Sequence, residues 1–420
     1  MRSLLGVLCE VAFELLTTVL RAAFFQHPFQ FAQLAFIRVW WHGRNYFLGI
    51  ADSDEGCLPF GISVDCVGER TDFASGSAPI RTTNRTMSRI LIATDAWHPQ
   101  VNGVVRTLDT TSRMLREWGH TVEVIEPTAF STMPVPFYPE ISISLAFPHR
   151  VSDRVARFQP DHIHIATEGP IGLWVRKFCR SRGWNFTTSY HTRFPEYLHQ
   201  LARVPERLSY RFLKWFHGAA SAMMVATPSL EAELIARQFH PPIRRWSRGV
   251  DLTLFRPRER IEAPYPRPVL LYVGRVSKEK GIEDFLTIAT PGTKVIVGDG
   301  PARAELERRF PEAKFLGYRK GESLGECYAI ADLFVFPSKT DTFGIVLIES
   351  LACGVPVAAY PVTGPVDIIT NERWGALDTN LGTAIERALR TGNRDACIAE
   401  GAKYTWENCT RQFFGNLVPR

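Results

Sequence analysis

Two acidic side chains, Asp341 and Glu349, stand in a stretch whose pattern predicts a strand, a polar loop, a helix and a second strand. The apolar run 333–336 stops at a proline, as a buried strand does. The mostly apolar segment 345–352 is followed by a glycine stop, which is typical of a helix end. Asp341 therefore lies in the loop, and Glu349 lies about one turn inside the helix.

This placement has a chemical meaning. The first backbone N–H groups of a helix have no partner inside it and form an anion site. Here they belong to Thr342, Phe343, Gly344 and Ile345. Glu349 could accept hydrogen bonds from a ribose diol, and Asp341 could hold sugar hydroxyls, so the stretch could bind both ends of a sugar nucleotide. The alternative is a solvated loop acid and an ordinary helix residue, although a glutamate buried in an apolar run needs a partner.

Two cations, Arg275 and Lys280, follow the predicted strand 269–273 and are bracketed by glycines. In open parallel sheets, ligands bind in the crevice beyond the carboxyl ends of the strands. A cation pair there can clamp a diphosphate and neutralise the charge that develops on a leaving nucleotide. The alternative is a solvated lysine-rich turn.

Three further candidates lie earlier in the chain. Gly103 belongs to a glycine loop that enters a helix, His191 lies at the end of the strand 186–190, and Glu168 follows the strand 162–166. We expect them to face the same crevice, with Glu168 near an acceptor. The alternatives are an Asn-Gly turn, a structural histidine and a helix N-terminal acid.

The order of elements predicts an α/β fold. From Met87 onward, strands and helices alternate, which is the pattern of parallel sheets with helices on both faces. We expect two Rossmann-like domains, 88–255 and 268–395, joined by a proline-rich linker, 256–267, and followed by a C-terminal helix, 396–420. Residues 1–87 lack this pattern. Our hypothesis is that they are a mis-called start or a poorly ordered, membrane-touching extension.

The composition excludes several classes of protein. The chain has 420 residues, of which 45% are hydrophobic and 22% charged, so it is not a disordered chain. The net charge of +6 suits an anionic ligand or membrane surface, and nothing indicates nucleic acid. The eight cysteines form no C-x-x-C pair. We therefore expect reduced thiols, no metal, no cofactor and a cytoplasmic protein.

The segment 205–217 carries Arg207, Arg211 and Lys214 along one stripe, beside apolar residues. This pattern is typical of an amphipathic helix at an anionic membrane surface, and it predicts peripheral attachment to the inner face of the membrane. The alternative is a helix that faces the core and has a solvated basic edge.

The pair Asp341-x₇-Glu349 resembles the signature of retaining glycosyltransferase family 4, in which seven residues separate two glutamates. Arg275 and Lys280 match the family's G-R-x-x-x-x-K-G motif. The resemblance implies a GT-B fold, in which an N-terminal acceptor domain and a C-terminal nucleotide-sugar domain face each other across a crevice. It also implies metal-independent transfer with retention of configuration. Aspartate in place of the first glutamate changes its reach, which bears on the choice of donor sugar.

The same resemblance assigns roles. Arg275 and Lys280 would hold the donor diphosphate, Gly103 would contact the donor or the acceptor, and His191 would lie beside the transferred sugar. The stretches around His191 and Asp341 look like those of bacterial GDP-mannose-dependent α-mannosyltransferases and sulfolipid synthases. This implies mannose from GDP-mannose and a lipid or glycan acceptor. The alternatives are a UDP-hexose-dependent glycolipid synthase, a sugar-nucleotide epimerase on the same fold, or a non-catalytic glycan- or membrane-binding protein.

Overall fold

The structure is a computed structural model that describes residues 41–42, 45–46, 87–100, 102–135, 138–144, 146–259 and 262–420. The chain divides into two compact units, Met1–Thr86 and Met87–Arg420. In the first unit, β1 (Trp41–His42) pairs antiparallel with β2 (Asn45–Tyr46). The hypothesis about an N-terminal extension otherwise lies outside the described residues. All that follows concerns the second unit.

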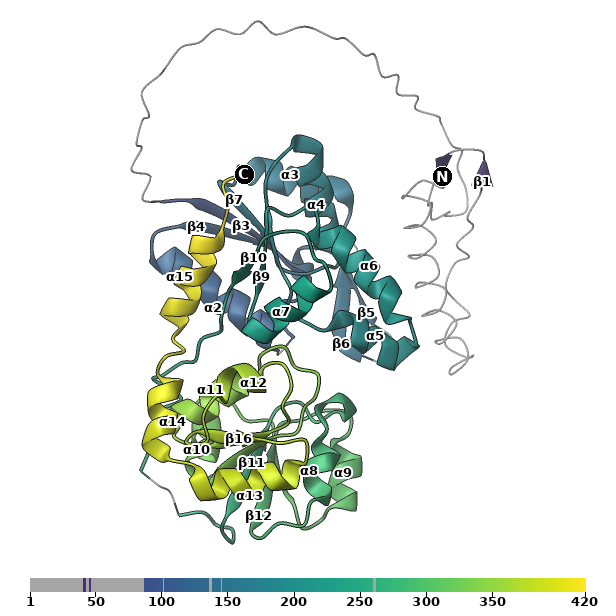
Figure 1. Ribbon diagram of the computed structural model, residues 1–420. Helices are drawn as coiled ribbons and strands as arrows, with labels where there is room; N and C mark the ends of the chain where they lie inside the picture. The colour runs from purple at the N-terminus through teal and green to yellow at the C-terminus, as the bar shows by residue number, and fades with distance from the viewer. Residues whose placement is uncertain are drawn as a thin grey trace, which may run out of the picture. The chain divides into compact units, whose positions relative to one another are not determined.

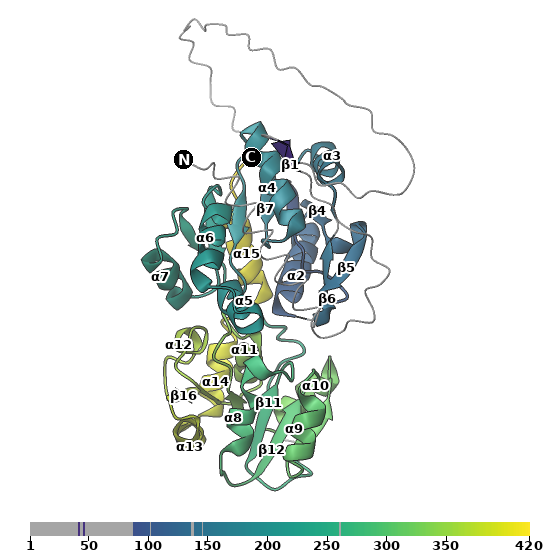
Figure 2. The same ribbon diagram turned by 90° about the vertical axis from the view of Figure 1, so that its right-hand side faces the viewer.

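The second unit begins with a six-stranded parallel sheet in the order β10-β9-β8-β7-β3-β4 (Figures 1 and 2). Its strands are β3 (Arg89–Ala93), β4 (Thr121–Ile125), β7 (His162–Ile165), β8 (Thr187–Ser189), β9 (Ala222–Val225) and β10 (Ile243–Arg245). The helices around it are α2 (Gly103–Glu117), α3 (Pro148–Phe158), α4 (Pro170–Arg182), α5 (Phe194–Ala202), α6 (Glu206–His217) and α7 (Pro228–Ala236). A short helix, η1 (Pro127–Ala129), leads into the hairpin of β5 (Thr132–Val135) and β6 (Tyr138–Ser144).

A second parallel sheet follows, in the order β13-β12-β11-β14-β15-β16. Its strands are β11 (Val269–Val273), β12 (Thr293–Val297), β13 (Lys314–Gly317), β14 (Leu333–Phe336), β15 (Val357–Ala359) and β16 (Gly375–Leu377). The connecting helices are η2 (Lys278–Lys280), α8 (Ile282–Thr287), α9 (Arg303–Arg309), α10 (Glu322–Ala329), α11 (Ile345–Ala352), α12 (Pro365–Ile368) and α13 (Leu381–Thr391). The chain ends with α14 (Arg394–Gly401) and α15 (Trp406–Asn416).

The central strands of the second sheet form where the sequence is continuously apolar. Every residue of β11 and of β14 is buried, because helices cover both faces of a parallel sheet and leave no solvent side. The predicted α/β class with two Rossmann-like sheets is confirmed. The hairpin of β5 and β6 and the helix α3 were not predicted.

The C-terminal end of the chain returns to the first sheet. Where the sequence predicts one helix over 396–420, the structure has two, and α15 packs against α2 and β10 (Figure 1). Phe413 of α15 is fully buried, with its ring 4.7 Å from that of Trp246 and 4.9 Å from that of His164. The first core is therefore completed by the last helix.

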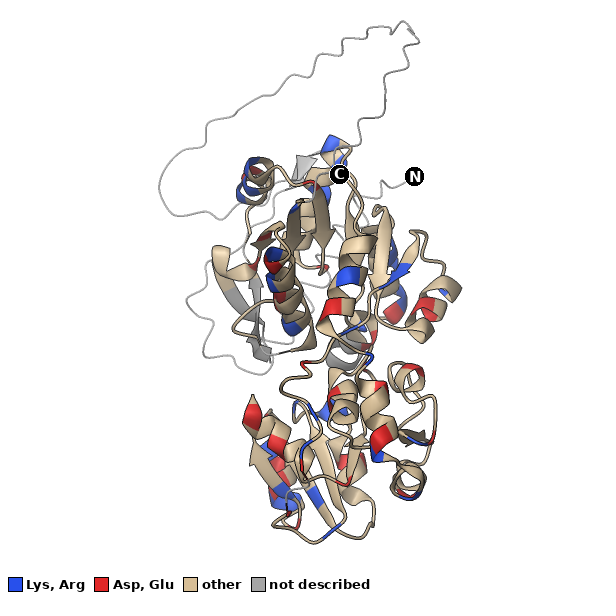
Figure 3. Cartoon of the chain, turned by 90° about the vertical axis from the view of Figure 1, so that its left-hand side faces the viewer, with Lys and Arg blue, Asp and Glu red and all other residues tan. Residues whose placement is uncertain are grey.

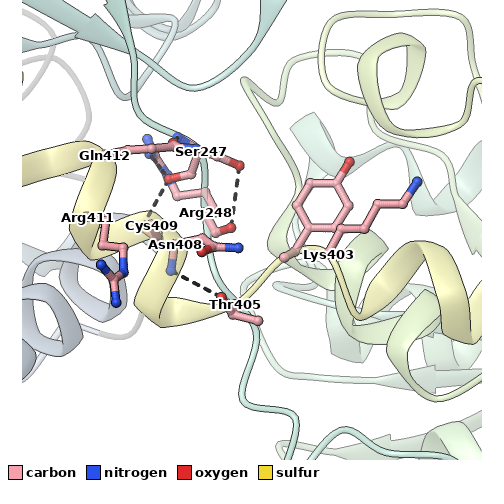
Figure 4. Close-up of a pocket in the computed structure, with 9 residues that line it drawn as sticks. Ser247, Arg248, Lys403, Thr405, Asn408, Cys409, Arg411 and Gln412 are labelled. Carbon is pink, nitrogen blue, oxygen red and sulfur yellow. Dashed lines mark hydrogen bonds between the residues drawn. The ribbon is translucent and has the colours of Figure 1, made fainter. Parts of the chain in front are cut away.

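The segments around Val250 and Tyr404 run side by side where the chain passes between the two sheets. The backbone N–H of Val250 donates to the carbonyl of Tyr404, at 2.8 Å. A cavity of about 240 Å³ lies beside this crossing, and Figure 4 shows the side chains that line it. It is lined by Ser247, Arg248, Lys403, Tyr404, Thr405, Asn408, Cys409, Arg411 and Gln412.

Charged residues of both signs are spread over the second unit. In the view of Figure 3, Lys and Arg are interspersed with Asp and Glu along the helices of both sheets. Among the described residues, no helix has the length and apolarity needed to cross a bilayer.

Candidate active site

The second sheet brings the two predicted site stretches together. Its strand order reverses between β11 and β14, which are direct parallel neighbours. Loops that leave the carboxyl ends of such strands diverge and open a crevice between them. The ammonium of Lys280, after β11, donates to both carboxylate oxygens of Asp341, after β14, at 2.8 Å each. Side chains that are 61 positions apart in the chain thus form one ion pair.

The electrostatics of Asp341 follow from this pair. Burial favours the neutral acid, but the charge of Lys280 and its hydrogen bonds outweigh burial and hold the pKa of Asp341 below its usual value. Asp341 is therefore a carboxylate at neutral pH, able to accept hydrogen bonds from hydroxyl groups. Arg275 lies in the same turn, where its backbone carbonyl accepts a hydrogen bond from the hydroxyl of Tyr272, at 2.8 Å.

The start of α11 provides an anion site next to this pair. Gly344 caps the helix with φ of 82°, a left-handed conformation that glycine adopts without strain. Of the described groups, none accepts a hydrogen bond from the backbone N–H of Thr342, Phe343, Gly344 or Ile345. Those four donors, with the positive end of the helix dipole, are available to a phosphate.

The glycine loop of the first sheet approaches this helix start. A methyl group placed on Gly103 would lie 3.3 Å from Cδ1 of Ile345. The helices α2 and α11 therefore begin close together, each at the end of a loop. The predicted pairing of Gly103 with the donor site stays a prediction, but the two elements are adjacent.

Glu349 is buried and fully partnered. Its side chain is 2% exposed. The hydroxyl of Tyr328, on α10, donates to Oε2 at 3.1 Å, and the guanidinium of Arg106, on α2, donates to Oε1. The expectation that a glutamate in this apolar run needs partners therefore holds, and one of these partners comes from the first sheet.

His191 lies inside a chain of hydrogen bonds. Arg248 donates to its Nδ1, at 2.9 Å, and its Nε2 lies 2.8 Å from the hydroxyl of Ser189. Because arginine can only donate, Nδ1 is the acceptor and the ring proton is on Nε2. Ser189 in turn lies 3.1 Å from Nε2 of His164, whose Nδ1 lies 2.9 Å from the hydroxyl of Thr187.

These hydrogen bonds limit the protonation of the His191 ring and the ligands that the ring can bind. Burial and the positive charge of Arg248 hold the pKa of His191 well below its usual value, so the ring is neutral. Both ring nitrogens have protein partners, and a sugar hydroxyl could bond the ring only by replacing one of them. The backbone carbonyl of His191 accepts a hydrogen bond from the hydroxyl of Thr342, at 2.7 Å. His191 therefore joins the two sheets through its main chain.

Further hydrogen bonds connect the two sheets and their helices on the same side. Arg193, just before α5, donates to the hydroxyl of Thr363, at 2.7 Å. Asp367 of α12 accepts from the backbone N–H of Ser229, at 2.8 Å. Since Ser229 lies in the first turn of α7, this carboxylate satisfies an otherwise unpartnered helix donor.

Glu168 lies at the end of β7, and its carboxylate is 3.1 Å from Nε2 of the fully buried His217. Nearby Asp95 accepts hydrogen bonds from the backbone N–H groups of Ile171 and Gly172 at the start of α4. Burial raises the pKa of Asp95 to about 6. Sequence analysis named Glu168 and missed Asp95, which stands two positions after the end of β3.

The helix α6 faces the core and has a solvated basic edge, as the second alternative predicts, and attachment to a membrane surface stays a prediction. Tyr210, Leu213 and Phe216 are buried in the core, whereas Arg207 and Arg211 are exposed. Its Trp215 lies under the guanidinium of Arg176, at 3.8 Å. Its apolar side is thus largely occupied by the protein's own core.

Sequence analysis also missed Arg106, Tyr328 and Arg248. Arg106 stands three positions after Gly103 and therefore lies on the same side of α2. This spacing could have indicated that Arg106 faces the same crevice. Arg248 and Tyr328 had no comparable signal, because their partners lie 57 and 21 positions away.

Comparison with known proteins agrees with this architecture. A family model described as Glycosyltransferase Family 4 matches residues 101–254, and one described as Glycosyl transferases group 1 matches residues 256–398. A GDP-mannose-dependent alpha-mannosyltransferase of Mycobacterium tuberculosis is 31% identical over 315 residues, which cover 69% of this chain and 83% of that protein. The chain belongs to glycosyltransferase family 4.

Two further similarities extend this finding. The sulfoquinovosyl transferase SQD2 of Arabidopsis thaliana is 28% identical over 74% of this chain and 69% of its own length. Sucrose-phosphate synthase from Thermosynechococcus elongatus superposes with a TM-score of 0.65 at 20% identity, over 78% of this chain and 98% of that one. The fold is GT-B, and the protein is a glycosyltransferase, as the resemblance implied.

Proposed function

We propose that this glycosyltransferase moves a hexose, with retention of configuration, from a nucleotide diphosphate sugar to a lipid or glycan acceptor. The observation that carries the proposal is the ion pair of Lys280 with Asp341 beside four free N–H groups at the start of α11. The cation and the helix start supply positive charge for a diphosphate. The carboxylate supplies acceptors for the hydroxyls of the attached sugar.

In this proposal the difficult event is departure of the nucleotide. The bond between the anomeric carbon and the phosphate oxygen breaks, and the acceptor oxygen bonds to that carbon on the same face. Lys280, Arg275 and the N–H groups of α11 stabilise the negative charge that develops on the leaving diphosphate. The leaving phosphate oxygen takes the proton of the acceptor hydroxyl. These groups need no metal for that task.

The other site residues orient the substrates. Asp341 accepts from hydroxyls of the donor sugar, and Glu349 accepts from the ribose diol. The main chain at His191 is held by Thr342 near the sugar, and Glu168 faces the acceptor. Contacts between the two sheets exclude water, which limits hydrolysis of the donor.

For the donor we propose GDP-mannose. Its support is that the Mycobacterium tuberculosis relative is named as GDP-mannose-dependent. For the acceptor we propose a lipid, since another relative, 25% identical, is named as an alpha-monoglucosyldiacylglycerol synthase of Streptococcus pneumoniae. A lipid acceptor requires access to a membrane surface, for which Arg207 and Arg211 on the exposed edge of α6 provide positive charge.

The test is a donor panel. The full-length protein is incubated with GDP-mannose, UDP-glucose, UDP-galactose or UDP-glucuronate, with and without lipid extract and EDTA, and nucleotide release is measured. We expect release from GDP-mannose that depends on lipid and is unchanged by EDTA. Release that EDTA abolishes would contradict the metal-free mechanism. Failure with all four donors would contradict transfer from this class of substrate.

Attachment to membranes is tested separately by co-sedimentation with vesicles that contain anionic lipid. We expect binding at low salt that is lost at high salt, because surface charges are screened within about 8 Å at physiological ionic strength. The charge-neutral variant with Arg207→Gln and Arg211→Gln should bind less. Equal binding by this variant would contradict the role of α6.

A further inference from the structure

The carboxylate of Glu349 has one partner from each sheet. Tyr328 lies on α10, which like α11 connects strands of the second sheet, and it is completely buried. Arg106 comes from the first sheet, 243 positions away in the chain, and its side chain is 36% exposed. The two partners therefore differ in their freedom to move: Tyr328 is enclosed by the core, whereas Arg106 reaches in from the edge of the crevice.

The proposed function creates a competition at this carboxylate. A ribose diol donates through two hydroxyls, and a carboxylate accepts through two oxygens. Each carboxylate oxygen can accept more than one hydrogen bond, but the Glu349 side chain is only 2% exposed, with Tyr328 against Oε2 and Arg106 against Oε1, so a diol gains access only where one of these donors moves away. Because Tyr328 is enclosed, the donor that can be replaced is Arg106.

We propose that Arg106 is a latch that the nucleotide displaces. Without nucleotide, its guanidinium neutralises Glu349 and joins α2 to α11. When the ribose binds, the diol takes over the carboxylate and Arg106 withdraws. This inference rests on the proposed function, because it requires Glu349 to hold the ribose.

The surroundings of Arg106 can accommodate the withdrawn side chain. Its guanidinium carbon already lies 5.5 Å from the centre of the Phe255 ring and 6.0 Å from that of Trp406. Aromatic faces attract a guanidinium at such distances. The cation can thus leave Glu349 without losing every favourable contact, which a displaceable latch requires.

If Arg106 is a latch, its removal should strengthen nucleotide binding. Arg106→Ala removes the competitor and leaves a buried carboxylate with only one donor, which the ribose diol then satisfies. Titration calorimetry with GDP and UDP should show binding about tenfold tighter than in the wild type for the nucleotide that the enzyme uses, a size typical of coupled contacts. The 2′-deoxy analogue, which has only one hydroxyl to offer, should gain much less.

Two further variants separate the possible causes. Arg113→Ala removes the same charge from an exposed position of α2, where the side chain is 69% exposed, and should leave affinity unchanged. Glu349→Gln should reduce the preference for ribonucleotide over deoxyribonucleotide, which tests the role of Glu349 in the proposed function. Circular dichroism confirms that each variant folds.

The outcomes are distinct. If Arg106→Ala binds both nucleotide forms more weakly, Arg106 is a phosphate ligand and the latch is refuted. Unchanged affinity also refutes the latch. If wild type binds neither GDP nor UDP, or if Glu349→Gln keeps the full preference for ribose, the proposed function fails at this site, whatever Arg106 does.

Discussion

Lys280 and Asp341 each determine what the other can do. The ammonium keeps Asp341 ionised, and the carboxylate fixes the ammonium at the carboxyl end of β11, where a diphosphate would lie. In the proposed function, a sugar nucleotide uses both groups at once, with its phosphate at the cation and its sugar at the acid. Asp341 is one methylene shorter than the glutamate of the family's motif, and its salt bridge with Lys280 fixes its position.

Replacing Lys280 tests this pair. Lys280→Ala should lower kcat/KM about 10²- to 10³-fold, because it removes a preorganised positive charge from the leaving group. Steady-state nucleotide release with the best donor measures the effect. Lys278→Ala is the matched control, since Lys278 belongs to the same turn but is exposed. Equal losses in both variants would contradict a specific role for Lys280.

Some of the candidate site residues could be predicted from the sequence, and others could not. Arg275, Lys280, Asp341 and Glu349 could be found from the sequence because each lies in a short strand–loop–helix stretch with its own pattern. Arg106 and Arg248 could not, because what they contact is decided by how the two sheets pack. The same cause explains His191: its position at a strand end was predictable, but not the two partners that occupy its ring.

Among the elements, β7 carries a buried ionisable group that makes the fold sensitive to acid. Burial lowers the pKa of His164 to about 3, whereas in an unfolded chain a histidine titrates near 6.5. Below pH 6.5 the unfolded chain thus binds more protons than the folded protein. Stability must fall as the pH falls from 6.5 toward 3.

Urea unfolding at several pH values tests this consequence. His164 should contribute a slope of about 1.4 kcal/mol for each pH unit below 6.5. His164→Gln, whose amide can still donate and accept, should be less stable at pH 8 but lose stability less steeply toward pH 4. The same slope in both proteins would show that His164 does not control the acid sensitivity.

The helix α15 stabilises the core around the first sheet. Phe413 is fully buried against Trp246 and His164. Phe413→Ala should lower the free energy of unfolding by about 3–5 kcal/mol, as expected for a large aromatic truncation in a core. Phe414→Ala, at the adjacent and only partly buried position, should cost clearly less. Similar losses, measured by urea unfolding, would contradict this assignment of α15.

The alternation of apolar and amphipathic runs was sufficient to predict the two parallel sheets of the second unit. The strands β11 and β14 and the helices α4 and α11 begin and end where the sequence predicts, because each is a clean apolar or amphipathic run between proline and glycine signals. The return of α15 to the first sheet was not predictable in this way. Its apolar side would fit either core, and only tertiary packing selects one.

The proposed function requires that the residues held by the two sheets transfer a hexose with retention of configuration. The most direct measurement is proton NMR of the glycoside formed from GDP-mannose, whose mannosyl group is α-linked, by wild type and by Lys280→Ala. We predict an α-linked mannoside from wild type and little product from the variant. A β-linked product, or free mannose with no glycoside when acceptor lipid is present, would contradict retaining transfer by this enzyme.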